Sequence, residues 1–402
     1  MNIMGNTMDQ RVKEIFDTVV KHRRHLHQNP ELSFQEYQTS VYIQEELTKL
    51  GIPFQVVMET GVVAVLEGRK ETSDAIVVLR ADIDALPIFE KNEVSYKSNN
   101  DGIMHACGHD FHTANLLGAA TLLVNMLDTF SGKIILLFQP AEERIPGGAK
   151  QIVESRVLES FEGTIKAVLG LHVSPRLPLG TIGIKPGRFM ASSDEFYIRI
   201  KGKGGHAAEP HRAVDPVMIG VQLLNALQQI VSRKADPSIP SVLTFGRFIG
   251  DGAANVIPQE VLLEGTFRTM DEPWRKEALH HIETLIANLP VALGAEVTCE
   301  VRHGYPVLQN DPHLAQELTR VLRNHLDQIH VVDPGIWMAA EDFAYYSHQY
   351  PSLFLLLGTS NTNASTQYGL HNAQFDLDEN AFHVGIPVLI QSVLHLLNTS
   401  NG

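Results

Sequence analysis

The run Met104–His112 combines a thiol, imidazoles and a carboxylate, reading Met-His-Ala-Cys-Gly-His-Asp-Phe-His. Cys107 and His109 are two residues apart, so a soft thiolate and an imidazole could reach one divalent ion from a single turn of chain. An isolated cysteine is more often a small buried hydrophobic residue, which is how we interpret Cys299. For Cys107, which has His105 and His109 as neighbours, we predict a functional role.

Further metal-binding residue types recur downstream, each after or near an apolar run that is typical of a strand. The candidate metal ligands are Cys107, His109, Glu143, His172 and His371. Five donors of this mixed type suit two adjacent divalent ions, bridged by the thiolate or by a water. Zinc, manganese and cobalt are all reasonable, and the ordinary order of metal affinities does not decide among them. The chain has 19 histidines, and we interpret most of them as ordinary core or surface residues.

Glu142 and Glu143 are adjacent, so their side chains diverge on an extended or loop backbone. One carboxylate can bind metal while the other faces the substrate. A metal-bound water has a pKa of about 7, and a nearby carboxylate can take its proton and pass it to a leaving amine. We therefore assign Glu142 the proton transfer and Glu143 the metal. The alternative is a solvated helix N-terminus, where acidic residues are favoured by the helix dipole.

The elements that must position these residues are short, continuous apolar runs separated by helical patterns. The runs span residues 75–79, 133–138, 167–171 and 353–357, and the main helical patterns between them span 113–127 and 147–159. This alternation predicts a doubly wound α/β sheet, in which ligands bind at the carboxyl ends of the strands. Asp82 and Asp84 follow the first run, Glu142 and Glu143 follow the second, and His172 ends the third.

Acidic residues at three further positions could support the ligands by hydrogen bonding to them. Asp82 and Asp84 are the stronger candidates, because they follow a core strand. Glu341 belongs to an acidic pair with Asp342 and could equally mark the start of a helix.

The middle third of the chain has a different pattern. Residues 195–201 alternate strictly between apolar and polar side chains, as a half-exposed strand does. A helix from Asp215, two strands at 242–248 and 261–268, a helix from 271 and a strand at 296–301 follow. The order β-α-β-β-α-β is ferredoxin-like. We predict an α+β domain at 185–303 that is inserted into a catalytic domain formed by 1–184 and 304–402.

The predicted inserted domain carries three more candidates. The loop 202–208 is rich in glycine and presents His206, which is suited to hydrogen-bonding an oxyanion, although the loop lacks the Lys-Ser/Thr ending of a phosphate loop. Asn255 and Arg268 could hold a substrate carboxylate, Arg268 through a bidentate pair. Arg268 could equally be an exposed cation on a strand.

Composition limits the partners. The 402 residues are 44% hydrophobic, and the net charge of -14 argues against binding nucleic acid or an anionic membrane. We expect no stretch to be long and apolar enough to span a bilayer, and residues 1–11 lack the apolar core of a signal peptide. The two cysteines offer no disulfide framework. We expect a cytoplasmic protein.

Taken in order, these motifs resemble the aminoacylase/carboxypeptidase superfamily of di-metal hydrolases. Within it, the chain resembles the N-acyl-amino-acid amidohydrolase and hippurate hydrolase branch, to which plant auxin-conjugate hydrolases are similar. The matching stretches run nearly end to end: 25–34, 80–87, 104–112, 138–143, 170–172, 205–208, 254–258, 340–343 and 370–372.

The resemblance implies the five metal ligands, Glu142 as general base, and a lid domain through which the protein forms a homodimer. It implies that His206 reaches the active site of the partner subunit and that Cys107 stands where other members place a bridging aspartate. The implied substrates are N-acyl amino acids. The stretch 144–148 is less glycine-rich at its start than the family pattern, which leaves the acyl preference open.

The leading hypothesis is metal-dependent hydrolysis of the amide bond of acetyl- or benzoyl-amino acids, through attack of a metal-bound hydroxide that Glu142 generates. A dipeptidase or carboxypeptidase on the same scaffold is the alternative. A third hypothesis makes Cys107 a nucleophile with a histidine base. A non-enzymatic binding protein is the fourth, and the presence of Glu142 beside Glu143 argues against it.

Overall fold

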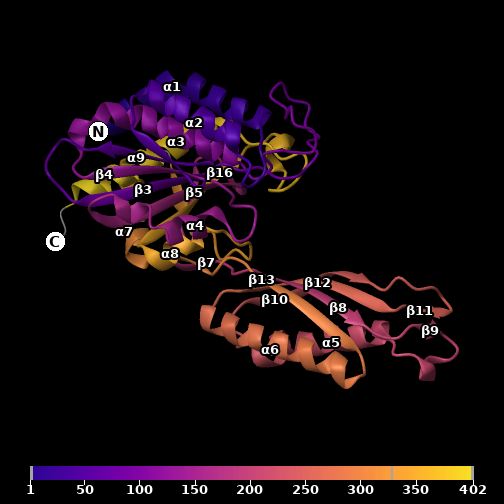
Figure 1. The fold of residues 1–402 in the computed structure, drawn as a ribbon. Helices are drawn as coiled ribbons and strands as arrows, with labels where there is room; N and C mark the ends of the chain where they lie inside the picture. Colours follow the sequence, from indigo (N-terminus) through magenta and orange to yellow (C-terminus); the bar gives the residue numbers. More distant parts are fainter. Residues whose placement is uncertain (1–2, 327–328, 400–402) are drawn as a thin grey trace. The chain divides into compact units, whose positions relative to one another are not determined.

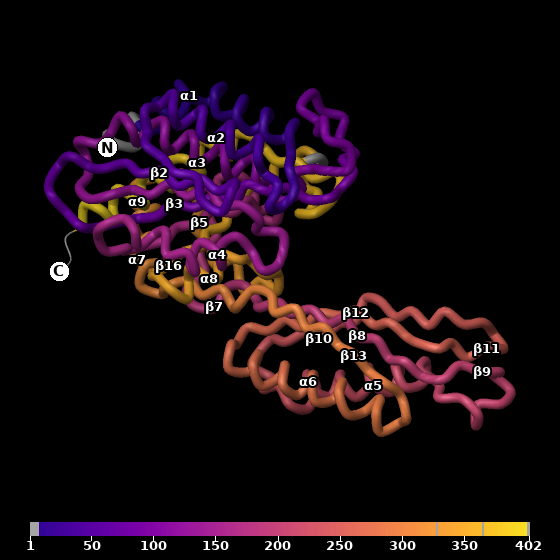
Figure 2. Tube along the Cα trace, in the orientation of Figure 1, coloured from indigo at the N-terminus to yellow at the C-terminus, as the bar shows by residue number. Residues whose placement is uncertain are grey.

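The computed structural model describes residues 3–326 and 329–399. The chain forms two compact units (Figure 2). The first comprises Met1–Gly187, Gln309–Gly335 and Asp342–Gly402, and the second comprises Arg188–Leu308 and Ile336–Glu341. Most of the predicted inserted domain, residues 185–303, lies in the second unit, which also contains the later segment Ile336–Glu341. The predicted domain boundaries stay a prediction.

The first unit contains a large mixed sheet, which confirms the predicted doubly wound α/β class. Among the described residues its strand order is β1-β2-β4-β3-β5-β16-β6-β15. The pairs β3–β4, β3–β5, β5–β16 and β6–β15 are parallel, whereas β1–β2, β2–β4 and β6–β16 are antiparallel. The strands are β1 (Phe54–Val57), β2 (Gly61–Glu67), β3 (Ala75–Asp82), β4 (Lys133–Gln139), β5 (Thr164–Pro178), β6 (Thr181–Gly183), β15 (His330–Val332) and β16 (Ser352–Ser360).

Helices cover both faces of this sheet (Figure 1). One face packs against α1 (Ile3–Gln28), α2 (Tyr37–Lys49), α3 (His109–Leu123), α7 (Pro312–His325) and α9 (Phe382–Asn398) in a single apolar core. The helices α4 (Gly148–Ser155) and α8 (Ala344–Gln349) lie on the other face. Because β3 and β4 are buried almost throughout, their sequences are continuous apolar runs.

The second unit contains an antiparallel sheet of order β10-β12-β8-β13 with two helices, which is the ferredoxin-like arrangement. Its elements are β8 (Asp194–Lys201), α5 (Pro216–Gln229), β10 (Ser241–Ile249), β12 (Glu260–Thr269), α6 (Glu272–Ala292) and β13 (Glu296–His303). Asp215 and Asp271 cap the two helices through their side chains, and a proline follows each cap within the first turn. A separate pair is formed by β9 (Gly205–His206) and β11 (Val256–Ile257).

The remaining elements are short. The chain passes between the units at β7 (Gly187–Met190), at β14 (Leu308–Asn310), and again on either side of the segment Ile336–Glu341. Short helical segments of three to six residues occupy Val124–Thr129, Leu158–Ser160, Pro210–Arg212, Ile230–Lys234, Ala364–Gln367 and Glu379–Ala381.

Two predicted boundaries near the candidate site are wrong. The helix α3 begins at His109 and not at residue 113, because Gly108 in the left-handed conformation starts the helix directly before His109. The strand β5 continues through His172 to Pro178, since its later residues keep pairing with β16. His172 therefore projects from within a strand and not from its end.

The expectation that no segment is long and apolar enough to span a membrane is also corrected. The segment Glu379–Asn398 has a mean hydropathy of 1.4 over its most apolar stretch and passes that test by length and composition. Of that stretch, 67% is buried inside the first unit, where α9 packs against α1, α3 and α7. Its apolar character is that of a core helix.

Candidate metal centre

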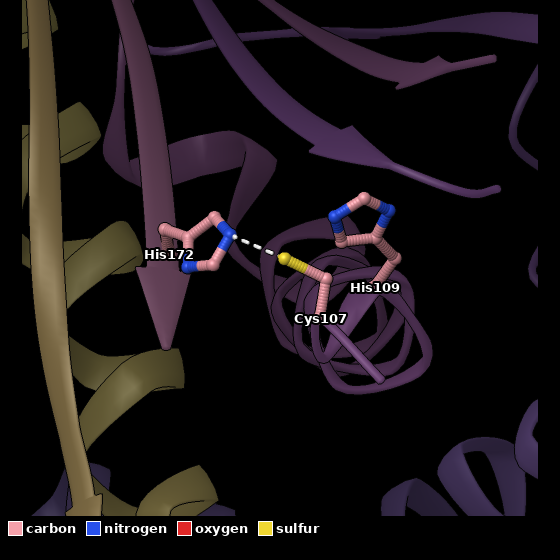
Figure 3. A group of neighbouring side chains, drawn as sticks. All are labelled: Cys107, His109 and His172. Carbon is pink, nitrogen blue, oxygen red and sulfur yellow. Dashed lines mark hydrogen bonds between the residues drawn. The ribbon is translucent and has the colours of Figure 1, made fainter. Parts of the chain in front are cut away.

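Two groups of potential metal ligands share one sulfur atom. The ligand atoms of Cys107, His109 and His172 all lie within 4.8 Å of one another, and those of Cys107, Glu143 and His371 do so as well. Figure 3 shows Cys107 and His172 pointing toward each other, with Sγ 3.5 Å from Nε2. The structure thus brings together all five residues that the sequence analysis proposed as ligands.

Sheet register explains how distant segments meet here. In β3, Asp82 lies opposite Gln139 of β4, and Arg80 lies opposite Gly170 of β5. The end of β3, the loop after β4 and the middle of β5 therefore lie at the same level of the sheet. The start of α3 adds Cys107 and His109 to this level.

Gly108 allows the two flanking ligands to converge. Its φ is +85°, a conformation that residues with a side chain rarely adopt. A Cβ atom at this position would also lie only 2.4 Å from Val173 Cγ2. Both the backbone conformation and the close approach of β5 therefore require glycine between Cys107 and His109.

Two residues with side chains adopt positive φ at the centre, Ala141 at +56° and His371 at +64°. Such conformations cost about 1–2 kcal/mol each and persist where the surroundings determine them. The His371 amide donates to the Ala106 carbonyl at 2.8 Å, and the Ala141 amide donates to the Glu36 carboxylate at 2.8 Å. These bonds hold the two loops that carry Glu142, Glu143 and His371.

Asp84 orients three of the candidate residues. Its carboxylate accepts hydrogen bonds from the amides of Glu142 at 3.1 Å and Glu143 at 3.0 Å, and from Ser33 Oγ at 2.6 Å. His109 Nδ1 lies 3.2 Å from the same carboxylate and 2.9 Å from the Asp84 carbonyl oxygen. Because Nδ1 is occupied in this way, His109 presents Nε2 to the centre.

Asp82 acts through a histidine that is not itself available to a metal. His112 Nδ1 lies 2.6 Å from the Asp82 carboxylate, while His112 Nε2 accepts the Val173 amide at 2.9 Å. Both ring nitrogens are therefore used, although His112 lies near His109 and Asp82. This chain of bonds fixes the backbone next to His172.

The buried atoms at the centre are those that a cation would satisfy. Within the described residues, His109 Nε2 and Glu143 Oε1 are buried without hydrogen-bond partners. Burial lowers the pKa of His109, but Asp82, Asp84 and Glu143 outweigh it and raise the pKa to about 10. Burial raises the pKa of the Cys107 thiol, and Glu143, Glu142 and Asp82 raise it further. This anionic field and the sulfur, nitrogen and oxygen donors fit divalent cations.

Glu142 lies beside the ligands without completing either group that contains Cys107. Its Oε2 lies 3.9 Å from His109 Nε2, and its side chain is 7% exposed. His371 is 53% exposed, so the centre is open to solvent on that side. A carboxylate in this place could exchange protons with a molecule that enters from the open side.

Residues 78–395 match the peptidase family M20/M25/M40. The chain belongs to this family. It is 41% identical over 381 residues to an N-acetyl-L-cysteine deacetylase from Bacillus subtilis, covering 94% of this chain and 88% of the relative. An N-acyl-L-amino acid amidohydrolase from Geobacillus stearothermophilus is 43% identical, with 75% and 80% covered. Thermostable carboxypeptidase 2 from Saccharolobus solfataricus is 38% identical, with 93% and 94% covered.

A solved structure of the same family has the same fold. The crystal structure of the Bacillus subtilis YXEP protein, described as a dinuclear metal-binding peptidase of the M20 family, superposes with a TM-score of 0.80. It is 33% identical in sequence, and the match covers 96% of this chain and 100% of that one. The resemblance inferred from the motifs is therefore confirmed at the level of the family.

The other predicted residues of this M20 chain lie in the second unit. His206, on β9, is exposed, and its Nδ1 accepts the Ala208 amide at 3.1 Å. Asn255 is exposed, and its carbonyl accepts the Ala207 amide at 3.0 Å. Arg268, on β12, is half-buried and donates to the Met338 carbonyl at 3.2 Å. Their roles in binding substrate or stabilising charge stay predictions.

The predicted supporting residue Glu341 is buried at the end of the second unit, and its role also stays a prediction. The neighbouring Asp342, the second member of the acidic pair, makes its hydrogen bonds within the first unit. Its carboxylate accepts the Gln139 side-chain amide at 2.8 Å, the Ala149 amide at 2.9 Å and an Arg80 guanidinium nitrogen at 2.9 Å. These bonds tie the end of β4 to the start of α4, and so define both ends of the loop that carries Glu142.

Proposed function

We propose that this M20-family protein is a metal-dependent amidohydrolase that cleaves the amide bond of N-acyl amino acids. One observation carries the proposal: two groups of metal-ligand atoms share Cys107 Sγ, and the Glu142 carboxylate lies beside both. Relatives named for N-acetylcysteine and N-acyl amino acids, at 41% and 43% identity, support the substrate class.

In this proposal the residues around Cys107 would hold two divalent ions. Cys107, His109 and His172 would hold one ion, and Cys107, Glu143 and His371 would hold the other. Bound ions of this kind polarise a carbonyl oxygen and acidify a water. Zinc, manganese and cobalt all suit this donor set, so the proposal does not name the metal.

The residues of the chain then perform the proton transfers. Glu142 accepts a proton from the attacking water, whose oxygen forms a bond to the acyl carbon. As the carbon–nitrogen bond breaks, Glu142 returns that proton to the departing nitrogen, so the products are a carboxylic acid and an amino acid. The His206 side chain would donate a hydrogen bond to the carbonyl oxygen as it gains negative charge, and Asn255 or Arg268 would hold the substrate carboxylate.

The variant Glu142→Gln tests this mechanism. Glutamine keeps the size and hydrogen-bonding surface of the side chain but cannot carry the proton, so we expect near-normal metal content and a loss of turnover by orders of magnitude. Glu154→Gln on the exposed surface of α4 is the matched control, because Glu154 is 64% exposed. Normal turnover by Glu142→Gln on acetyl- and benzoyl-amino acids would refute the mechanism.

A carboxypeptidase or dipeptidase is the second candidate, favoured by the 38% identity to a thermostable carboxypeptidase. Both activities break an amide bond next to a free carboxylate, so the same ligands serve either. A panel of acetyl- and benzoyl-amino acids, assayed beside unblocked dipeptides and a longer peptide, separates them. Faster hydrolysis of the unblocked peptides would favour the second candidate.

A thiol nucleophile at Cys107 is disfavoured by its surroundings. Reactive cysteines occupy electropositive sites, which lower the thiol pKa. Burial and three neighbouring carboxylates raise the pKa of Cys107 instead. Chelation followed by restoration of metal provides the test, since an enzyme that depends on a thiol nucleophile would keep its activity without the ion.

We further propose that the protein forms a homodimer through the second unit. The strand β10 is at the edge of its sheet, and exposed apolar side chains gather on it and on the adjacent α5. These side chains are Met218 and Val221 on α5 and Val242, Phe248 and Ile249 on β10, each at least 36% exposed. Val242 projects from the sheet face away from α5, because it alternates with Leu243, which is buried in the core beneath the helices. Unprotected edge strands readily pair with another chain.

Light scattering of the variant Val242→Lys tests the dimer. A lysine at Val242 of the edge strand should yield monomers, whereas the control Val291→Lys, at a 57% exposed position on α6, should not. A monomeric wild-type protein would refute the dimer without affecting the proposed chemistry.

The proposed role of His206 in the partner's active site can be tested by mixing two inactive variants. Subunits carrying Glu142→Gln are combined with subunits carrying His206→Ala and allowed to exchange. If His206 acts across the dimer, each mixed dimer has one intact site. Activity should then rise to about a quarter of the wild-type value, because half of randomly paired dimers are mixed. If His206 acts within its own subunit, mixing restores nothing.

A further inference from the structure

Glu36 is a buried acid to which neither the family resemblance nor the proposed mechanism assigns a role. It is 0% exposed. One carboxylate oxygen accepts the amides of Phe34 at 2.9 Å and Ala141 at 2.8 Å, and the other accepts the Thr60 hydroxyl at 2.8 Å. The side chain therefore joins the segment before α2, the start of β2 and the loop after β4.

The bond to Ala141 completes an arrangement around the loop that carries the proposed base. Three successive amides, those of Ala141, Glu142 and Glu143, donate to carboxylates. Glu36 accepts the first and Asp84 accepts the other two. Successive backbone amides can bind anions, and here two side-chain carboxylates of the same chain accept all three hydrogen bonds.

Glu36 also occupies a position where a side chain usually caps a helix. It precedes α2 at the N-cap position, yet its side chain makes no capping hydrogen bond to the helix. The first-turn amides of Gln38 and Thr39 are instead accepted by Glu31, at 3.1 and 2.8 Å. The carboxylate of Glu36 is thus directed away from the helix and toward Ala141.

Keeping a carboxylate at this place is energetically unfavourable. Burial raises the pKa of Glu36 to about 7, and the neighbouring Asp84 contributes to the rise. A buried acid whose ionised form is disfavoured is a costly way to stabilise a fold. What it supports is the left-handed conformation of Ala141, at φ +56°.

We propose that Glu36 is a positioning residue, which holds Ala141 in the left-handed conformation and thereby sets the backbone from which Glu142 and Glu143 project. It acts through the loop and does not touch the substrate. The predicted effect of Glu36 on turnover rests on the proposed function. Its predicted effect on the conformation of the loop after β4 does not.

Four variants test the proposal. Glu36→Ala removes all three bonds, and Glu36→Asp withdraws the acceptor by one methylene in case the alanine variant fails to fold. Glu36→Gln keeps an oxygen for both amides and turns its NH2 group toward the Thr60 hydroxyl. Glu31→Ala is the matched control, because it removes two backbone hydrogen bonds from the same segment without reaching Ala141.

The first measurement is amide hydrogen exchange in peptides that span residues 139–147, on the metal-free full-length protein. Glu36→Ala and Glu36→Asp should speed exchange at residues 141–143, whereas Glu36→Gln and Glu31→Ala should leave it near the wild-type rate. Unchanged exchange in both Glu36→Ala and Glu36→Asp would overturn the proposal.

The second measurement separates kcat, KM and metal affinity on an N-acyl amino acid. Loss of a residue that orients the groups around a metal costs about 10–100-fold in affinity or activity, so Glu36→Ala should lose that much, mainly in kcat or metal affinity. Glutamine should recover most of the loss. Equal losses in Glu36→Ala and Glu31→Ala would mean general destabilisation and would also overturn the proposal. If the wild-type protein hydrolyses no such substrate, the proposed function fails and the exchange result still decides the role of Glu36.

Discussion

Replacing Asp84 by asparagine tests how far the candidate metal centre depends on one buried carboxylate. Each oxygen of Asp84 accepts two hydrogen bonds. One oxygen accepts from His109 and the Glu142 amide, and the other accepts from Ser33 and the Glu143 amide. Asparagine has a single acceptor oxygen and places an NH2 group where the second one was.

The two orientations of the asparagine have similar consequences. If NH2 replaces the oxygen near Ser33, the hydroxyl can rotate to accept, but the Glu143 amide loses its partner. If it replaces the other oxygen, His109 keeps the Asp84 carbonyl at 2.9 Å, but the Glu142 amide loses its partner. One buried amide is left unsatisfied in either case, at a cost of about 1–3 kcal/mol, and the charge-assisted bonds are lost as well. We expect a loss of about 3 kcal/mol in the free energy of unfolding.

The metal should bind more weakly too, because Asp84 orients His109 and the loop that carries Glu143. A loss of about 10–100-fold in affinity is expected for a partner of this kind. Urea denaturation of the metal-free protein measures the stability, and competition with a chelator measures the affinity. Ser33→Ala, which removes one of the four bonds, is the control and should lose about 1 kcal/mol. Wild-type stability and metal affinity in Asp84→Asn would refute the reasoning.

Further predictions follow from other buried groups. Arg23→Met should lower the free energy of unfolding by about 3 kcal/mol in urea denaturation, because it removes the permanent cation 2.9 Å from the buried Asp110 and leaves that carboxylate with His27 alone. Although burial alone would raise the pKa of Asp110, Arg23 and His27 lower it below its ordinary value. The stability that this carboxylate contributes is therefore present above about pH 4 and lost as the pH falls further. The free energy of unfolding, measured as the pH is lowered, should show that loss. The loss should be smaller in Arg23→Met. Gly108→Ala should reduce metal binding in equilibrium dialysis, since its Cβ would overlap Val173.

The sequence predicted the fold where burial leaves a pattern in the chain. The strands β3, β4 and β16 are covered on both faces, so each is a continuous apolar run. In the second unit, β8 is covered on one face and alternates. Strands such as β6 and β15 are only three residues long, and pairing with neighbours distant in sequence defines them. No local pattern marks strands of that length.

The candidate ligands could be predicted from the sequence for a related reason. Thiols, imidazoles and carboxylates at the ends of core strands are unusual, and the ends of parallel strands meet at one edge of a sheet. The hydrogen-bond partners of those ligands had no comparable signal. Arg80 and Asp342 are separated by most of the chain, yet they lie 2.9 Å apart. An arginine within an apolar run can be recognised as unusual, but its partner cannot be named without the register of the sheet.

Glu31 and Glu36 show why residue type and local position cannot assign such roles. Glu36 directly precedes a helix, where an acidic side chain usually meets the first amides, and Glu31 lies further upstream in a segment without regular structure. In the fold the uses are exchanged: Glu31 reaches forward to the amides of α2, and Glu36 reaches across the unit to Ala141. Each glutamate accepts two backbone amides in the structure, so the number of amides bound does not distinguish their roles. What distinguishes them is the loop after β4, whose strained residue needs a buried acceptor that only Glu36 supplies among its described contacts.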